Sequence, residues 1–152
     1  MPCCCFIGHK NCPKEIKEKL LETIFELVAN KGVTQFFVGT QGEFDKHVYD
    51  VLHEIKKIQD IKIYVVLAYI DRVPVNIYFD MNETIFPDEL TKTPLRLAVR
   101  RRNSYMIEKS DYVIAYLDSP FSNTVVNVEE ALRKKRNVIN LGNYDIGNII
   151  IK

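Results

Sequence analysis

Short apolar runs alternate with amphipathic stretches along most of the chain, and this alternation limits the fold more than any other feature. Runs apolar enough for strands buried on both faces of a sheet lie at 3–7, 35–38, 63–69, 112–117 and 138–141. Stretches with apolar residues at helical spacing lie at about 13–31, 44–55, 95–109 and 125–135. Single helices between strands form βαβ units with right-handed crossovers. We therefore predict an α/β fold, a Rossmann-like three-layer sandwich with a mainly parallel sheet of about five strands, as one domain over residues 1–152.

The bulk composition argues against several classes of partner. The 152 residues carry a net charge of +1, so no general excess of positive charge favours nucleic acid or a membrane surface. No apolar run reaches the roughly 18 residues that a membrane span needs. We therefore expect a cytoplasmic protein that has neither a membrane nor nucleic acid as its partner.

All four cysteines lie near the start of the chain, at positions 3, 4, 5 and 12. A disulfide framework would spread its cysteines along the chain, so this grouping fits small core residues in a reducing compartment. A zinc site made of Cys5, His9 and Cys12 would have only three neighbouring ligands and no CxxC pair. We therefore expect neither a metal ion nor a cofactor.

The segment 71–94 has the weakest pattern. Prolines at 74, 87 and 94 flank polar turns, and only 75–79 has the composition of a short strand. Because a loop of this length in a small domain is usually functional or mobile, we interpret the segment as an irregular loop or lid. Its apolar residues are also numerous enough for a protein contact. Near the end of the chain, 148–152 is a candidate edge strand.

In sheets of this kind the ligand lies outside the carboxyl ends of the strands. That rule selects 8–10, 39–45, 71 onward and 118–124. Each stretch leads toward a helix N-terminus, whose free N–H groups and dipole favour an anion. The glycines at 39 and 42 match neither GxGxxG nor a Walker loop, so a tight turn is an alternative explanation for them. The predicted ligand-binding residues in these stretches are Gly8, His9, Gly39, Thr40, Gln41, Gly42, Asp45, Ser119, Ser122, Asn123 and Thr124.

Arg102 falls in the middle of the apolar stripe of the helix at 95–109. A charge in that position needs a partner or a cavity, because burying it alone costs several kcal/mol. The alternatives to a ligand are that the side chain extends past the sheet edge to solvent or pairs with an internal carboxylate. We therefore add Arg102 and its neighbour Asn103 to the predicted ligand-binding residues. Arg100 and Arg101 point elsewhere around the helix and are expected at the solvated surface.

Glu129 raises the same question on the helix at 125–135, where the pattern predicts that it faces inward and that Glu130 faces water. An inward carboxylate close to Arg102 is either a structural ion pair or a catalytic pair beside a bound sugar. Arg102 and Glu129 are therefore also the catalytic candidates.

Three stretches resemble one known family. Residues 5–10 are similar to a CxFxGHR opening, 37–45 to an FxVGxxGxFD motif, and 102–114 to an RNRWMIxxSDYVI block. All three belong to small bacterial proteins of the DUF1273-like branch of the SLOG superfamily. Residues 65–69 and 138–141 also fit, so the resemblance covers most of the chain.

The resemblance implies a Rossmann-like fold that binds nucleotides or nucleotide-derived signals. The superfamily also includes phosphoribohydrolases and DNA-processing proteins of the Smf/DprA type, and homo-dimers are common in it. In the phosphoribohydrolases an arginine and a glutamate, associated with a GGxGTxxE loop, act on the N-glycosidic bond. Arg102 takes the arginine's place, and Glu129 the glutamate's if Ser122 and Asn123 replace two glycines. The replacements bring Cβ atoms to where glycine lets a ligand approach closely, which favours binding over catalysis.

Three functions are therefore considered. The leading hypothesis is the binding of a nucleotide-type ligand by a sensor, with Arg102 meeting a phosphate or ribose-phosphate anion. The alternative is an N-glycosidase that acts on nucleoside monophosphates, in which Glu129 stabilises an oxocarbenium-like transition state or activates water. The third is a protein-interaction module without a small ligand.

Overall fold

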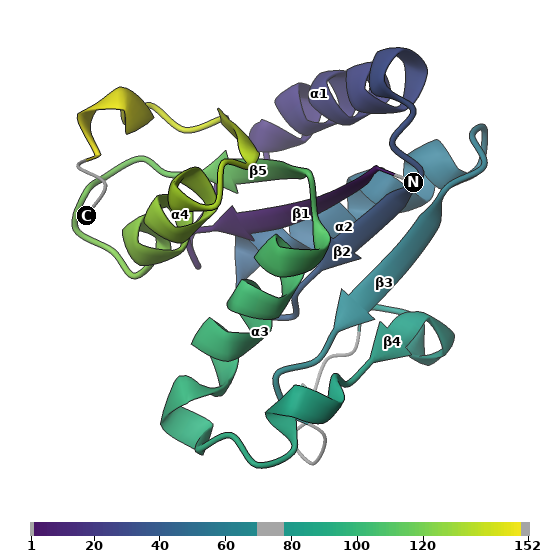
Figure 1. Ribbon diagram of the computed structural model, residues 1–152. Coiled ribbons are helices and arrows are strands. Elements are labelled where there is room, and N and C mark those ends of the chain that lie inside the picture. The colour runs from purple at the N-terminus through teal and green to yellow at the C-terminus, as the bar shows by residue number, and fades with distance from the viewer. Residues whose placement is uncertain (1, 70–77, 150–152) are drawn as a thin grey trace.

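The computed structural model describes residues 2–69 and 78–149, and its elements follow the predicted alternation (Figure 1). The bounds of β2 and α3 coincide with the predicted ones, and α1 begins three residues later than its proline at 13 suggested. The strands and α-helices are β1 (Cys3–Gly8), α1 (Ile16–Lys31), β2 (Gln35–Val38), α2 (Glu43–Lys56), β3 (Lys62–Val66), β4 (Thr84–Ile85), α3 (Leu95–Lys109), β5 (Tyr112–Tyr116), α4 (Thr124–Arg133) and β6 (Asn137–Asn140).

The strands form one six-stranded sheet in the order β4-β3-β2-β1-β5-β6, and the pairs recorded between them are all parallel. From β1 the chain steps outward through β2 and β3 to β4, and it then returns through α3 to the other side of β1. The direction of winding therefore reverses between β1 and β5, where Gly8 pairs with Tyr116. Ligands of open parallel sheets bind at such a reversal, outside the carboxyl ends of the strands.

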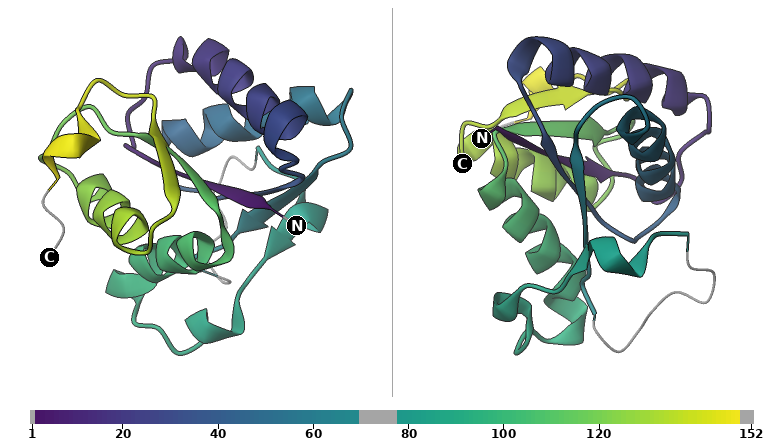
Figure 2. Two further views of the ribbon diagram at one scale, coloured as in Figure 1. Left: turned by 45° about the horizontal axis from the view of Figure 1, so that its top comes forward. Right: turned by 90° about the vertical axis from the view of Figure 1, so that its right-hand side faces the viewer.

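Helices cover both faces of the sheet (Figure 2). On one face α1 and α2 bury Leu20, Ile24 and Leu52 against alternate strand residues such as Cys4 and Phe36. On the other face α3 and α4 cover the remaining strand residues, which include Cys3, Cys5 and Val113. The predicted three-layer Rossmann-like α/β fold is thus confirmed, and the four cysteines are buried in its core. Cys5 and Cys12 belong to opposite faces, so the zinc site considered from the sequence is not assembled.

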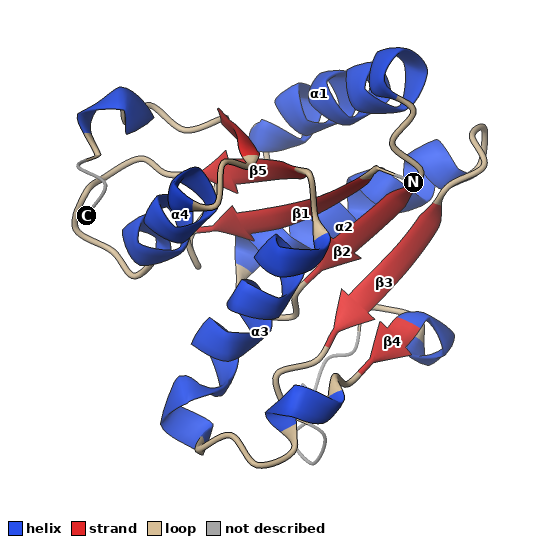
Figure 3. Cartoon of the chain, in the orientation of Figure 1, coloured by secondary structure: helices blue, strands red, loops and turns tan. Residues whose placement is uncertain are grey.

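The prediction of about five strands is one strand short. The additional strand is β4, which pairs with the end of β3 (Figure 3). Two residues are too few to show a period in the sequence, so the irregular interpretation of 71–94 is wrong for this part. Tyr78, Phe79 and Phe86 pack on the core, which leaves less apolar surface in this segment for a partner than its composition suggested.

Two further strand predictions fall largely on residues that are not described. Of the candidate strand 75–79, residues 75–77 lie outside the described part of the chain. Of the candidate edge strand 148–152, only 148 and 149 are described, and Asn148 ends a 3-10 turn, Ile146–Asn148.

Neither a membrane span nor a group of metal ligands is found in the described structure. No helix within residues 2–69 and 78–149 is long and apolar enough to cross a bilayer. Over the same ranges, no three His, Cys, Asp or Glu side chains are grouped as a metal ion would require.

Gly8 lets the end of β1 pack directly against α2. A Cβ at this position would lie 2.3 Å from Cδ2 of Phe44, which is fully buried. Gly42, in the loop after β2, packs against Lys10 in the loop after β1. It has φ of 93°, and a Cβ there would lie 2.7 Å from Cα of Lys10. The two glycines therefore hold the loops after β1 and β2 in close contact.

We predict that Gly8→Ala lowers the free energy of unfolding by about 1–3 kcal/mol, because the added methyl group overpacks against the Phe44 ring. Urea unfolding measures the loss. In a Phe44→Leu background, where a smaller side chain can yield, the same change should cost less. Equal costs in both backgrounds would contradict this contact as the cause.

Candidate functional site

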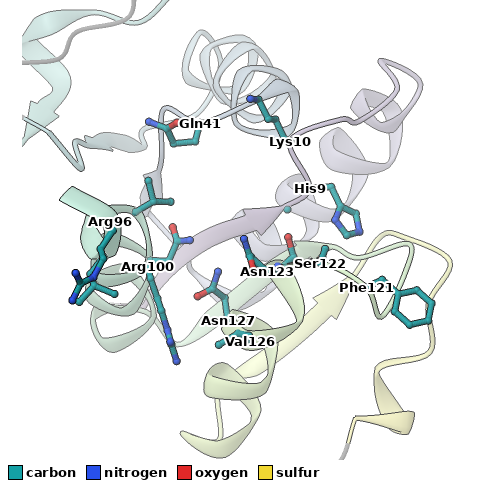
Figure 4. A pocket seen from close by; sticks show the side chains of 15 residues that line it. His9, Lys10, Gln41, Arg96, Arg100, Phe121, Ser122, Asn123, Val126 and Asn127 are labelled. Carbon is teal, nitrogen blue, oxygen red and sulfur yellow. Dashed lines mark hydrogen bonds between the residues drawn. The ribbon is translucent and has the colours of Figure 1, made fainter. Parts of the chain in front are cut away.

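A cavity of about 780 Å³ opens at the carboxyl ends of β1 and β5, between α3 and the start of α4 (Figure 4). The cavity lies where the direction of winding of the sheet reverses, and we call it the switch-point pocket. Its described lining consists of Gly8, His9, Lys10, Gln41, Arg96, Leu97, Val99, Arg100, Asn103, Phe121, Ser122, Asn123, Thr124, Val126 and Asn127.

The switch-point pocket is positively charged. Lys10, Arg96 and Arg100 line it, and its described lining residues include no carboxylate. Arg96 and Arg100 are one helical turn apart on α3, and Asn103 continues the same stripe. The side chains of Lys10, Arg96 and Arg100 are exposed, so they can reach a ligand without first breaking a buried contact.

Seven of the residues predicted from the sequence line the pocket: Gly8, His9, Gln41, Asn103, Ser122, Asn123 and Thr124. The sequence reasoning missed Lys10, Arg96, Arg100, Phe121 and Asn127. The placement of Arg100 at the surface was correct about its exposure but overlooked the cavity beside it. The available signal was the polar i, i+4, i+7 stripe of Arg96, Arg100 and Asn103, which borders the apolar stripe of α3.

Arg102 is buried, as the pattern predicted, with only 2% of its surface exposed. It does not line the pocket, because protein groups occupy its guanidinium. Nη1 donates to the carbonyl of Val66 at 3.2 Å, and Nε donates to Oδ1 of Asn103 at 2.9 Å. Arg102 therefore holds the amide of a pocket residue, so that Nδ2 of Asn103 is the end of the amide that can donate to a ligand.

Asp45 is the carboxylate that faces Arg102. A Cβ at Gly39 would lie 2.5 Å from Nη1 of Arg102 and 2.8 Å from Oδ2 of Asp45, so both groups press against this glycine. Gly39 is therefore required for space and not for a left-handed backbone. Burial raises the pKa of Asp45 to about 6, and the charge of Arg102 and the N–H of Gln41 oppose the rise.

The turn between β2 and α2 was expected to offer N–H groups to an anion, and the structure corrects this. The N–H of Gln41 donates to Oδ2 of Asp45 at 2.9 Å, and the N–H of Glu43 donates to the carbonyl of Lys10 at 2.7 Å. Both donors are thus already satisfied within the protein. Of the predicted residues in this turn, Gln41 lines the pocket, whereas Gly39, Thr40, Gly42 and Asp45 do not.

Glu129 does not meet Arg102. It lies outside the lining of the pocket, its side chain is 27% exposed, and it pairs with Arg133 at 4.0 Å. The prediction for Glu130 was also wrong: Glu130 is buried and accepts a hydrogen bond from Ser104 Oγ at 2.7 Å. The physical reason is that α4 packs against α3 as well as against the sheet. Of its apolar residues Val128 is therefore fully buried, whereas Val125 and Leu132 are only partly buried.

The loop between β5 and α4 is shaped by its own hydroxyl groups. The N–H of Phe121 donates to Ser119 Oγ at 3.1 Å, and the N–H of Thr124 donates to Ser122 Oγ at 3.2 Å. Ser119 therefore has a structural contact and lies outside the pocket lining. The same loop leaves the ring of Phe121 91% exposed at the edge of the cavity.

His9 is held as a neutral imidazole. Its Nε2 lies 2.8 Å from the N–H of Asp118, which makes Nε2 an acceptor and places the ring proton on Nδ1. Burial lowers the pKa of His9 below its usual value, although the nearby Asp118 carboxylate opposes this. The positive charge of the pocket therefore comes from Lys10, Arg96 and Arg100.

Fold and site together define a Rossmann-like α/β protein with a cationic pocket at its topological switch point. A solved structure with a similar fold is that of DNA processing protein A (DprA) from Streptococcus pneumoniae, with a TM-score of 0.67 and 16% sequence identity. The match covers 92% of this chain and 50% of that chain, so this chain spans about half the length of its neighbour. No family model and no curated protein matches the sequence.

At this identity the likeness concerns the fold alone. It agrees with the Rossmann-like fold that the sequence resemblance implied. Because the neighbour is by name a DNA processing protein, the expectation that nucleic acid is not a partner gains no support from it.

We predict that Arg102→Met lowers the free energy of unfolding by about 3–5 kcal/mol, because the change leaves Asp45 buried without its countercharge. The matched control is Arg100→Met on the same helix, which should change stability by no more than about 0.5 kcal/mol since that side chain is exposed. Denaturant unfolding of both variants measures the difference. Equal losses would remove the structural role assigned to Arg102.

A second prediction concerns pH. The pKa of Asp45 rises from an ordinary value of 3.8 to about 6 on folding, so the folded state holds this proton more tightly than the unfolded state. Its contribution to stability is therefore present at low pH and is lost as pH rises through this interval. The Asp45→Asn variant has no carboxyl proton at this position to lose. As pH rises from 4 to 7, its free energy of unfolding should therefore increase by about 1–3 kcal/mol relative to that of the wild type. Unfolding curves that stay parallel across this range would contradict the raised pKa.

Proposed function

We propose that the switch-point pocket binds a nucleotide or nucleotide-derived anion of the ribose-phosphate type, and that the protein acts as a sensor. The observation that carries this proposal is the concentration of Lys10, Arg96 and Arg100 around one cavity whose described lining has no carboxylate. Arginine side chains suit phosphate groups because their planar donors can bind two oxygens at once. The resemblance of the sequence to the DUF1273-like branch of the SLOG superfamily supports the same class of ligand.

In this proposal Arg102 is a positioning residue and not a ligand contact. The arginines that meet the phosphate are Arg96 and Arg100, which lie on the open side of α3 (Figure 4). Arg102 acts through its bond to Asn103 Oδ1, which directs the donor end of that amide toward the pocket. The exposed ring of Phe121 offers a surface on which a base can stack.

Binding is proposed in preference to N-glycoside cleavage. A hydrolase needs a carboxylate close to the bond that breaks, as a general base or to stabilise the oxocarbenium ion. Glu129 is paired with Arg133 outside the pocket lining. We therefore assign the protein recognition of the intact ligand.

The test is calorimetric titration with AMP. We expect wild-type protein to bind AMP, and Arg96→Gln and Arg100→Gln each to weaken binding by about tenfold, because each removes a charge-assisted hydrogen bond. Arg101→Gln is the matched control, since Arg101 is exposed on the same helix but lies outside this pocket. Adenosine, which lacks the phosphate, should bind weakly and equally to all four proteins.

Three outcomes would contradict the proposal. One is the absence of AMP binding to the wild type, and another is an equal loss in Arg101→Gln. The third is the release of free adenine from AMP on chromatography, which would restore the hydrolase. A short single-stranded oligonucleotide belongs in the same series, and tighter binding of it than of AMP would point to nucleic acid as the ligand.

A further inference from the structure

Among the described residues that line the switch-point pocket, Asn127 alone has a buried side-chain oxygen without a hydrogen-bond partner. It lies on α4, where only 6% of its surface is exposed, and it lines the switch-point pocket. Its Oδ1 is buried and has no hydrogen-bond partner. Buried side-chain oxygens are normally paired, because an unpaired one loses its hydration without compensation.

The contacts of the neighbouring polar residues differ from those of Asn127. Asn103 Oδ1 accepts from Arg102, and Ser122 Oγ accepts from the N–H of Thr124. Those acceptors are satisfied before a ligand arrives. Asn127 therefore carries an acceptor that the protein itself leaves unsatisfied, on a residue that lines the cavity.

We infer that Asn127 is a specificity residue, which accepts a hydrogen bond from an O–H or N–H group of the ligand. Rotation about its Cβ–Cγ bond, a soft torsion, turns Oδ1 toward the cavity. In Figure 4 the amide of Asn127 projects from α4 and that of Asn123 from the loop just before it, whereas Arg96 and Arg100 project from α3. A ligand whose phosphate lies on α3 thus reaches Asn127 with a different part of the molecule.

This inference rests on the proposed function and adds the chemistry of that second part. A phosphate dianion offers only acceptors, so it cannot satisfy Oδ1. A ribose hydroxyl or an exocyclic amino group can. The ligand is therefore one that combines an anion with a hydrogen-bond donor, and inorganic phosphate alone is excluded as the complete ligand.

The same position makes a prediction for the unliganded protein. Asn127→Leu has a similar shape and removes the unpaired oxygen, so the thermal midpoint of the unliganded variant should equal or exceed that of the wild type. A residue kept for stability would show the opposite change. For the binding experiment below, the matched control is Asn143→Leu. This asparagine is exposed and lies outside the pocket, so the change should leave AMP binding unchanged.

The decisive experiment titrates wild type and Asn127→Leu with AMP and three analogues. AMP has three donor groups on its ribose and base, and each analogue lacks one of them: 2′-deoxy-AMP, 3′-deoxy-AMP and purine riboside 5′-monophosphate. We expect the wild type to bind AMP about tenfold or more tightly than one of these analogues, and Asn127→Leu to bind the two equally. Asn127→Asp, which keeps an acceptor in place, should retain the preference even though its charge weakens binding of the anion.

The outcomes separate the two proposals. If the wild type binds AMP but distinguishes none of the three analogues, the role of Asn127 is overturned and the proposed function stands. If the preference persists in Asn127→Leu, another residue reads the donor and the inference is likewise wrong. If the wild type does not bind AMP, both proposals fail. If Asn127→Leu does not fold, Asn127→Ala takes its place in the same titrations, because it also removes the acceptor.

Discussion

The burial of one guanidinium, that of Arg102, determines how α3 is seated on the sheet. Its donors reach the carbonyl of Val66 at the end of β3 and the amide of Asn103, while the Asp45 carboxylate of α2 faces it across Gly39. A buried charge cannot be moved without leaving these partners unpaired, so it fixes the rotation of the helix about its axis. With Arg102 directed inward, the polar stripe of Arg96, Arg100 and Asn103 is turned toward the switch-point pocket. The orientation of the cationic wall is therefore a consequence of a contact that the ligand would never touch.

The architecture was predictable because each of its signals is repeated along the chain. Five apolar runs and four amphipathic helices specify a parallel sheet, and the rule that ligands bind outside the carboxyl ends of the strands then selects the edge of the sheet at which the cavity lies. The sixth strand was not predictable, since Thr84 and Ile85 form only two rungs beside β3 and carry no period. What places them there is tertiary packing, such as the burial of Phe79 in the core.

The site was predictable only in part, for a reason that concerns charge. From sequence, an arginine in an apolar stripe indicates that a partner exists, and it does not say whether the partner is protein or ligand. For Arg102 the partners were a carbonyl, an amide and a carboxylate of the chain itself. The arginines beside the cavity, Arg96 and Arg100, look like ordinary surface residues, because a pocket open to solvent leaves them as exposed as any other cation. The inward charge therefore belongs to a residue that supports the pocket, and the outward charges belong to residues that line it.

On helix α4, too, the sequence pattern does not show which polar residues are buried beside the cavity. Its buried face contains Thr124, Asn127, Val128 and Ala131, so apolar residues alone misplace the face and bring Glu129 inward instead. Polar residues occupy this face because part of it borders a cavity and not the core. The costs of the site are unequal: the like charges of Arg96 and Arg100 repel by only a few tenths of a kcal/mol in water, whereas an unpaired buried amide costs about 1–3 kcal/mol. The larger cost falls on the residue best shielded from solvent, where a hydrogen bond from a ligand discriminates most strongly between similar molecules. In the proposed function, the exposed charges of the pocket draw anions and Asn127 distinguishes among them.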